Sequence, residues 1–130
     1  MLRTNSLLVA ILLVGCSGSG TGPPEEIPLE NPDIRISSMV ISHPADKTVA
    51  LTTVQNFGPG GGFYKVFFYV QDGEDEIIAR VTPDAWLTTG FTFVGNWLVS
   101  EEVETLTKAE VYQRTETSTW ELSQTYTPGP

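Results

Sequence analysis

Seven short runs of β-branched and aromatic residues occupy the chain from Ile34 onward, and they constrain its fold more than any other feature. Gly, Pro, Asn or Asp separates the runs, and these residues favour turns. We therefore expect each run to form a strand. The runs are Ile34–Ile41, Thr48–Gln55, Phe63–Gln71, Glu76–Val81, Phe91–Val99, Thr107–Arg114 and Thr119–Tyr126.

The number and spacing of these runs indicate a fold class. Seven strands in about 95 residues, with frequent turn signals, are typical of an immunoglobulin-like β-sandwich. Evidence for helix is restricted to Asp84–Leu87 and Glu101–Lys108, each long enough for about one turn. The sequence predicts an all-β, seven-stranded immunoglobulin-like β-sandwich over residues 34–127, preceded by a signal peptide (1–15) and a flexible linker (16–33).

The run Phe63–Val70 is apolar at every even position, and its odd positions are interrupted only by Lys65. Half-buried strands normally carry polar residues on the solvent side. This strand is therefore either central and covered on both faces, or it displays aromatic rings. Its odd-numbered rings, Phe63, Phe67 and Tyr69, are candidates for binding a partner.

Two later runs show an alternation that predicts which side chains face the core. Gly95, inside the first of them, is placed to allow a bulge. The expected core side chains are Phe91, Phe93, Trp97 and Val99 in the first run and Trp120 and Leu122 in the second.

The N-terminal residues are typical of an export signal. Arg3 is followed by the apolar run Leu7–Val14 and by the small residue Gly15, which together form a basic start, an apolar stretch and a cleavage site. The apolar run is about half or less of the roughly 20 residues that a membrane-spanning helix needs. We therefore expect cleavage rather than a permanent span.

The sequence Leu13-Val14-Gly15-Cys16 ends in the only cysteine and resembles the lipobox of bacterial lipoproteins. The resemblance implies recognition of Leu13, Val14 and Gly15 by the signal peptidase and cleavage before Cys16. It also implies a diacylglycerol on the sulfur of Cys16 and often a third acyl chain on its amine. Two acyl chains hold a protein firmly at a bilayer. The alternative is a secreted protein in which Cys16 is incidental.

Ser17, at the position after Cys16, resembles the pattern exported to the outer membrane in envelopes that have two membranes. The stretch Ser17–Pro32 is rich in Ser, Gly, Thr, Pro and Glu and reads as a tether. The sole cysteine excludes disulfides and cysteine-based zinc sites within the mature chain.

Charge excludes one class of partner. The chain has 16 acidic and 7 basic residues, and cleavage would remove Arg3, which leaves a formal charge of −10. The basic residues are scattered, whereas nucleic-acid binding needs a basic cluster. We therefore expect no nucleic-acid partner, and we expect the membrane contact to come from the anchor on Cys16 alone.

The segment Val54–Gly58, the strand Phe63–Val70 and the turn Asp72-Gly73 resemble small immunoglobulin-like domains of the CARDB and FxLYD kind. The resemblance runs from about residue 34 to 126. It implies a β-sandwich with a binding or adaptor role, and it carries no catalytic residues to this chain.

The glycine-rich segment 56–62 lacks the Gly-Lys-Ser/Thr ending of a phosphate-binding P-loop, and it reads as a long turn. Phe57 within this turn and Trp86 in a later loop are the aromatic residues that we expect to be exposed. For Trp97 and Trp120 we expect packing in the core.

The only other candidates for chemistry are acidic residues and one histidine. Asp72, Glu74, Asp75 and Glu76 could offer oxygen ligands to Ca²⁺, but an Asp-Gly hairpin turn accounts for the same residues. His43 lies in a turn-like context, and the sequence supplies no oriented nucleophile beside it for catalysis with Asp46.

The sequence therefore predicts a membrane-anchored lipoprotein of the cell envelope, with the outer membrane favoured where two are present. Its sandwich is expected to be a non-catalytic binding or accessory module without a cofactor, and its partner is expected to be an envelope protein. A carbohydrate-binding module would require two or more coplanar exposed rings. A calcium-stabilised adhesion domain would require the four acidic side chains to converge.

Overall fold

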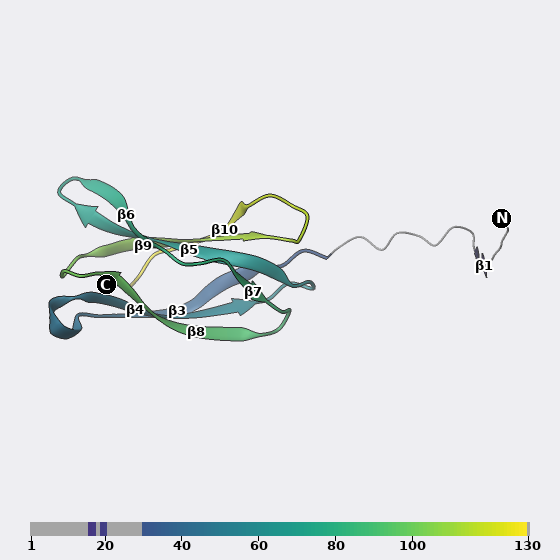
Figure 1. The fold of residues 1–130 in the computed structure, drawn as a ribbon, viewed down its shortest axis with the longest axis horizontal. Helices are drawn as coiled ribbons and strands as arrows, with labels where there is room; N and C mark the ends of the chain where they lie inside the picture. The colour runs from purple at the N-terminus through teal and green to yellow at the C-terminus, as the bar shows by residue number, and fades with distance from the viewer. Residues whose placement is uncertain (1–15, 18, 21–29, 130) are drawn as a thin grey trace.

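The computed structural model describes residues 16–17, 19–20 and 30–129. Over residues 30–129, eight antiparallel strands form two stacked sheets (Figure 1). The smaller sheet has the order β3-β4-β8, and the larger has the order β10-β9-β5-β6 with β7 paired to β5. The elements are β1 (Cys16–Ser17), β2 (Ser19–Gly20), β3 (Ile34–Ser42), η1 (Pro44–Asp46), β4 (Thr48–Asn56), β5 (Gly62–Asp72), β6 (Asp75–Val81), β7 (Ala85–Leu87), β8 (Thr92–Ser100), β9 (Leu106–Arg114) and β10 (Glu121–Tyr126).

The two facing sheets confirm the all-β sandwich, with eight strands where seven were expected. The additional strand is β7, and the helical turn expected over Asp84–Leu87 is wrong. Strand β6 ends at Val81 opposite Phe67, so the first residues of β5 have a free edge. Residues of β7 pair with that edge from Gly62 to Tyr64, and Leu87 becomes buried.

The second expected helical turn, over Glu101–Lys108, is also wrong. Residues 101–105 form the connection from β8 to β9, and β9 begins at Leu106. Leu106 is buried opposite Val70, and the backbone N–H of Gln71 donates to the carbonyl oxygen of Thr105 at 2.9 Å. Pairing with β5 therefore outcompetes a local helical turn, which would be too short to be stable.

The core lies between the sheets and is built mainly from alternate residues of β4, β5 and β9. Removing these apolar side chains from water is the main term that favours folding, at about 25 cal/mol per Å². Because the chain has one cysteine, this burial must carry the stability of the domain. The buried hydrophobic residues are Ile34, Ile36, Ala50, Val54, Tyr64, Val66, Phe68, Val70, Leu87, Val99, Leu106, Ala109 and Val111.

The structure of strand β8 shows that part of the expected core is wrong. Val99 is buried and Trp97 packs against the core, but Phe91 and Phe93 are exposed. Phe93 lies opposite the buried Val54 and shares its face, yet β8 is an edge strand and its ring is not covered. Gly95 does not form a bulge, because it pairs in register with Thr52, and the irregularity lies at the start of β4.

Trp120 and Leu122 are not core residues, which corrects the expectation for the last run. Leu122 lies opposite Tyr112 and is exposed on the outer face of the larger sheet. A register shift follows Leu122, and it turns Ser123 and Gln124 toward β3. The alternation identified one face of this strand, but pairing of Leu122 with the outward-facing Tyr112 placed that face outside.

The two ends of the sandwich differ in what they carry. We call one the tether end: the chain enters the domain there over residues 30–33, beside the β4–β5 turn (57–61), the β7–β8 turn (88–91) and the β9–β10 loop (115–120) (Figure 1). We call the other the far end, formed by residues 43–47, 73–74 and 101–105. The strands β3, β4, β5, β8 and β9 run from one end to the other, whereas β6, β7 and β10 span only part of that length.

A fully buried asparagine organises the tether end. The side-chain oxygen of Asn56 accepts hydrogen bonds from the backbone N–H groups of Asp33 (3.1 Å) and Gly58 (2.9 Å). Its amide nitrogen donates to the carbonyl oxygens of Gly60 (2.9 Å) and Leu87 (3.0 Å). One side chain thus joins the entering chain, the glycine-rich turn and β7.

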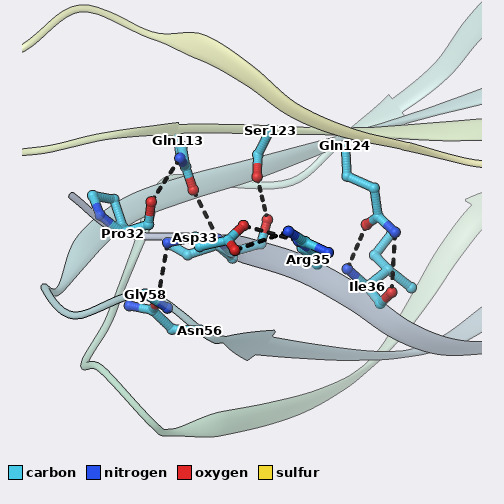
Figure 2. A network of polar contacts seen from close by, with 10 residues as sticks. Pro32, Asp33, Arg35, Ile36, Asn56, Gly58, Gln113, Ser123 and Gln124 are labelled. Carbon is cyan, nitrogen blue, oxygen red and sulfur yellow. Dashed lines mark hydrogen bonds and ion pairs between the residues drawn. The ribbon is translucent and has the colours of Figure 1, made fainter.

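The sheets are also joined by side-chain amides, which form the network in Figure 2. The side chain of Gln113 accepts from the N–H of Ile34 at 2.8 Å and donates to the carbonyl of Pro32 at 2.9 Å. Gln124 accepts from the N–H of Ile36 at 2.7 Å and donates to its carbonyl at 3.3 Å. The backbone edge at the start of β3, from Ile34 to Ile36, is satisfied in this way by the larger sheet, which blunts part of an edge that could otherwise pair with another chain.

Candidate functional site

The outer face of the larger sheet, which is turned away from β3, β4 and β8, carries aromatic rings and cations. We call it the aromatic–cation face. Figure 1 shows no described element lying over this face. Its residues are Phe63, Lys65, Phe67 and Tyr69 on β5, Trp86 on β7, Lys108, Glu110, Tyr112 and Arg114 on β9, and Trp120 just before β10.

The central strand β5 separates this face from the core. Its even-numbered side chains Tyr64, Val66, Phe68 and Val70 are buried. Its odd-numbered side chains are half-buried, because neighbours on β7 and β9 cover part of each ring. The strand is therefore central but is not covered on both faces, and its second face displays partly exposed rings, as the other alternative predicted.

Trp86 stands at the edge of the face, where its ring meets Phe63 edge-on at 4.9 Å between centroids with 78° between the planes. Gly61 makes room for it, because a Cβ atom on Gly61 would lie 2.7 Å from Cζ2 of Trp86. Trp86 is exposed, as expected, while Phe63 beneath it is half-buried. The glycine-rich turn is thus packed against the entering chain and against Trp86.

Two cations lie over the neighbouring rings. The guanidinium carbon of Arg114 is 4.6 Å from the ring centroid of Phe63 and 5.1 Å from that of Trp120. The ammonium of Lys65 is 4.4 Å from the centroid of Trp120. Across residues 30–129, no ion pair includes Lys65 or Arg114. These two cations thus lie against aromatic rings, in a chain whose net charge is strongly negative.

The other half of the face is neutralised by its own residues. Lys108 lies 3.2 Å from a carboxylate oxygen of Glu76 and 3.7 Å from one of Glu110. The phenol of Tyr69 donates a hydrogen bond of 2.8 Å to Glu110, and this bond, more than burial, raises the pKa of Tyr69 to about 12. A hydrogen bond from Thr107 and the nearby Lys108 hold the pKa of Glu76 below its usual value.

The rings of the face do not stack on a common plane. Phe63 and Trp86 are 78° apart, and Phe67 and Tyr112 are 62° apart at 5.2 Å. A sugar chain is usually held on coplanar rings, and neither of these pairs offers that arrangement. Mixed rings and arginine are instead common at protein hot spots.

The structure brings four of the five sequence-predicted binding residues together. Phe63, Phe67, Tyr69 and Trp86 share the aromatic–cation face, whereas Phe57 lies at the tether end, where Arg35 is 6.0 Å from its ring centroid. Phe57 is exposed, as expected. Sequence reasoning missed the cations and Trp120, and the position of Lys65 in the odd register of β5 was the one available signal.

The acidic turn forms a hairpin. Asp72 pairs with Asp75 across it, and Gly73 has φ +65°, a conformation that suits glycine. Of the four candidate calcium ligands, Glu76 turns to Lys108 and Thr107. Among the described residues, no group of three or more His, Cys, Asp or Glu side chains is placed to hold a metal ion.

His43 precedes the turn η1 and is exposed. Its Nε2 atom lies 3.3 Å from the backbone oxygen of Glu104. The contact joins two connections of the far end, and it is a structural one.

The lipobox residues Leu13, Val14 and Gly15 lie outside the described residues, as do positions 18 and 21–29 of the linker. Cys16 is described only through its backbone, which pairs with Gly20. In the part of the chain that the structure describes, no helix has the length and apolarity to span a bilayer.

Comparison with protein-family models found no match, and comparison with curated proteins found none either.

Proposed function

We propose that this chain is a lipid-anchored protein of the cell envelope whose sandwich binds a protein partner through the aromatic–cation face and performs no catalysis. The observation that carries the proposal is the composition of that face. Rings on three strands surround Lys65 and Arg114, which carry no ion pair within residues 30–129. Burying such a surface against a partner with carboxylates would gain both apolar contact and charge pairing.

The anchor is the part of the proposal supported by the sequence alone. Arg3, the apolar run and Cys16 support export and acylation. The edge-on geometry of the rings favours a protein over a sugar chain as the partner.

Site-specific photocrosslinking in the native envelope tests the partner-binding face. A photoreactive phenylalanine analogue replaces Leu122, which is 48% exposed on the aromatic–cation side of the larger sheet. The matched control replaces Leu51, which is 42% exposed on the smaller sheet. We expect a discrete protein adduct from position 122 and none from position 51.

A second change makes the test specific to the cations. Arg114→Gln removes the charge over Phe63 and Trp120 and should reduce the adduct by about tenfold, since a hot-spot arginine contributes about 1–2 kcal/mol or more. Equal adducts at both positions, or binding of the purified protein to envelope glycans with no protein adduct, would overturn the proposal.

A further inference from the structure

The tether end gathers aromatic side chains that the sandwich does not use for packing. In the described part of the chain, four aromatic side chains are exposed: Phe57 (54%), Trp86 (45%), Phe91 (63%) and Phe93 (46%). Phe57 lies in the β4–β5 turn, Phe91 in the β7–β8 turn, Phe93 at the start of β8, and Trp86 on β7. All four belong to elements that meet at this end.

These turns are held in place. The N–H of Phe57 donates to the carbonyl oxygen of Asp33 at 2.8 Å, and the N–H of Asn56 donates to that of Phe91 at 3.1 Å. The N–H of Gly90 donates to the carbonyl oxygen of Asn56 at 3.0 Å. The backbone beneath the rings is therefore fixed, and exposing several rings on a fixed surface is costly unless something covers them.

The sequence beyond the described domain indicates what covers them. The domain begins at Glu30, at this same end, and fourteen residue steps separate Glu30 from Cys16. At about 3.1 Å per residue, the segment reaches at most roughly 45 Å. If Cys16 is acylated, as the proposed function requires, the anchor is attached to the sandwich at the tether end.

Charge favours the same orientation. The far end and the strand ends beside it carry eight carboxylates and two cations. At the tether end, Arg35, Lys65 and Arg114 accompany five carboxylates. A membrane surface with anionic headgroups would repel the far end more strongly. The far-end carboxylates are Asp46, Asp72, Glu74, Asp75, Glu76, Glu101, Glu102 and Glu104.

We propose that the tether end docks on the lipid surface that holds the anchor, with the rings of Phe57, Phe91 and Phe93 in the interfacial region of the bilayer, while Trp86 belongs to the aromatic–cation face. Aromatic side chains are favoured at this depth, where apolar rings meet a partly hydrated layer. The inference rests on the lipid anchor of the proposed function. It places the aromatic–cation face at the side of the molecule, open to a partner standing on the same membrane.

The test uses the full chain, purified from its own membranes and reconstituted into phosphatidylcholine–phosphatidylglycerol vesicles. Acylation would consume the only native thiol, so Thr88→Cys or Val103→Cys introduces a single reactive thiol for a fluorophore. Thr88 lies in the β7–β8 turn at the tether end, and Val103 lies at the far end, where it is 57% exposed. Nitroxide-labelled lipids then quench a fluorophore that reaches the interface.

We expect the fluorophore at position 88 to be quenched at least about threefold more than that at position 103, because docked rings lie about 5–10 Å deep. Position 88 lies near the tether, so a control must separate the effect of that proximity from the effect of docking. The control adds Phe57→Ser and Phe91→Ser to Thr88→Cys, which removes two rings and leaves the tether unchanged. This variant should lose most of the quenching while keeping its far-ultraviolet circular dichroism.

Equal quenching at positions 88 and 103, or quenching that survives the loss of both rings, would overturn the docking. Energy transfer between labels at position 88 that grows with protein density would assign the rings to a second copy and would overturn it as well. A thiol that reacts in the unsubstituted protein would instead overturn the anchor, and the docking with it.

Discussion

Tyr69 illustrates how single residues tune the aromatic–cation face. Its phenol donates a hydrogen bond to Glu110, and the same carboxylate forms an ion pair with Lys108. One carboxylate therefore holds a ring and a cation side by side. Because ionised Tyr69 would face that carboxylate, the neutral phenol is favoured and its pKa rises to about 12. The residue is thus a donor over the whole physiological range.

The raised pKa of Tyr69 predicts a pH dependence in alkali. Below pH 10 the phenol is protonated in both the folded and the unfolded chain, so its hydrogen bond stabilises the fold in full. As the pH rises from about 10 to about 12, the unfolded chain loses this proton first and the contribution is progressively lost. In a spectrophotometric titration, Tyr69→Phe should remove one phenol that ionises near pH 12.

Tyr112→Phe is the matched control for this titration. The phenol of Tyr112 lies 3.4 Å from the same carboxylate oxygen of Glu110, which is farther than the phenol of Tyr69, and burial is the first cause of the raised pKa of Tyr112. The variant should keep the component near pH 12. If Tyr69→Phe keeps that component too, the hydrogen bond to Glu110 is not what holds the proton.

At the scale of elements, the side chain of Asn56 joins the entering chain, the glycine-rich turn and β7 at the tether end of the sandwich. Replacing it with Ala would leave two N–H groups and two carbonyls without their buried partner. Each unsatisfied group costs about 1–3 kcal/mol, and water would restore part of this. Asn56→Ala should therefore lower the free energy of unfolding in urea by about 2–4 kcal/mol.

The adjacent Gln55 provides the control, because it is half-buried and faces the other way along β4. Gln55→Ala should change the free energy of unfolding by less than about 1 kcal/mol. A loss of equal size in both variants would show that the strand end is sensitive to any substitution and that the four hydrogen bonds are not special.

The elements also show how far sequence reasoning extends. Runs of β-branched and aromatic residues between turn residues placed the seven longer strands to within two residues at each end, because such side chains favour strands and Gly, Pro, Asn and Asp favour turns. Sequence reasoning missed β7, since a three-residue strand is created by the free edge of β5 rather than by its own sequence. It misplaced Trp120 and Phe93, because the pairing of β10 with β9 and the edge position of β8 decide which rings are covered.

The candidate site was partly predictable for the same reason. The odd-numbered rings of β5 were visible in the sequence, since local alternation defines a face. Arg114 and Trp120 joined them only through pairing between strands distant in sequence, which no local pattern reports. The place of Arg114 on this face therefore follows from which strands pair and not from a local sequence pattern.

On the scale of the whole molecule, the proposed anchor and the sandwich are two separate parts of the chain, joined by the linker. Cys16→Ala removes the proposed site of acylation, and with it an attachment to which each buried CH₂ group contributes about 0.8 kcal/mol. We expect the protein to appear in the soluble envelope fraction or to remain uncleaved, as judged by fractionation and mass. Ser17→Ala, which keeps the thiol, should stay with the membrane. Unchanged membrane retention of a cleaved Cys16→Ala product would contradict the anchor.

The amides of Gln113 and Gln124, which join the smaller sheet to the larger one, carry no net charge and do not titrate. The hydrogen bonds by which they hold β3 therefore do not depend on pH or salt concentration, whereas ion pairs at an open surface weaken with added salt. If the domain is displayed in the cell envelope, as proposed, these contacts should let it keep its shape over a wide range of pH and salt concentration.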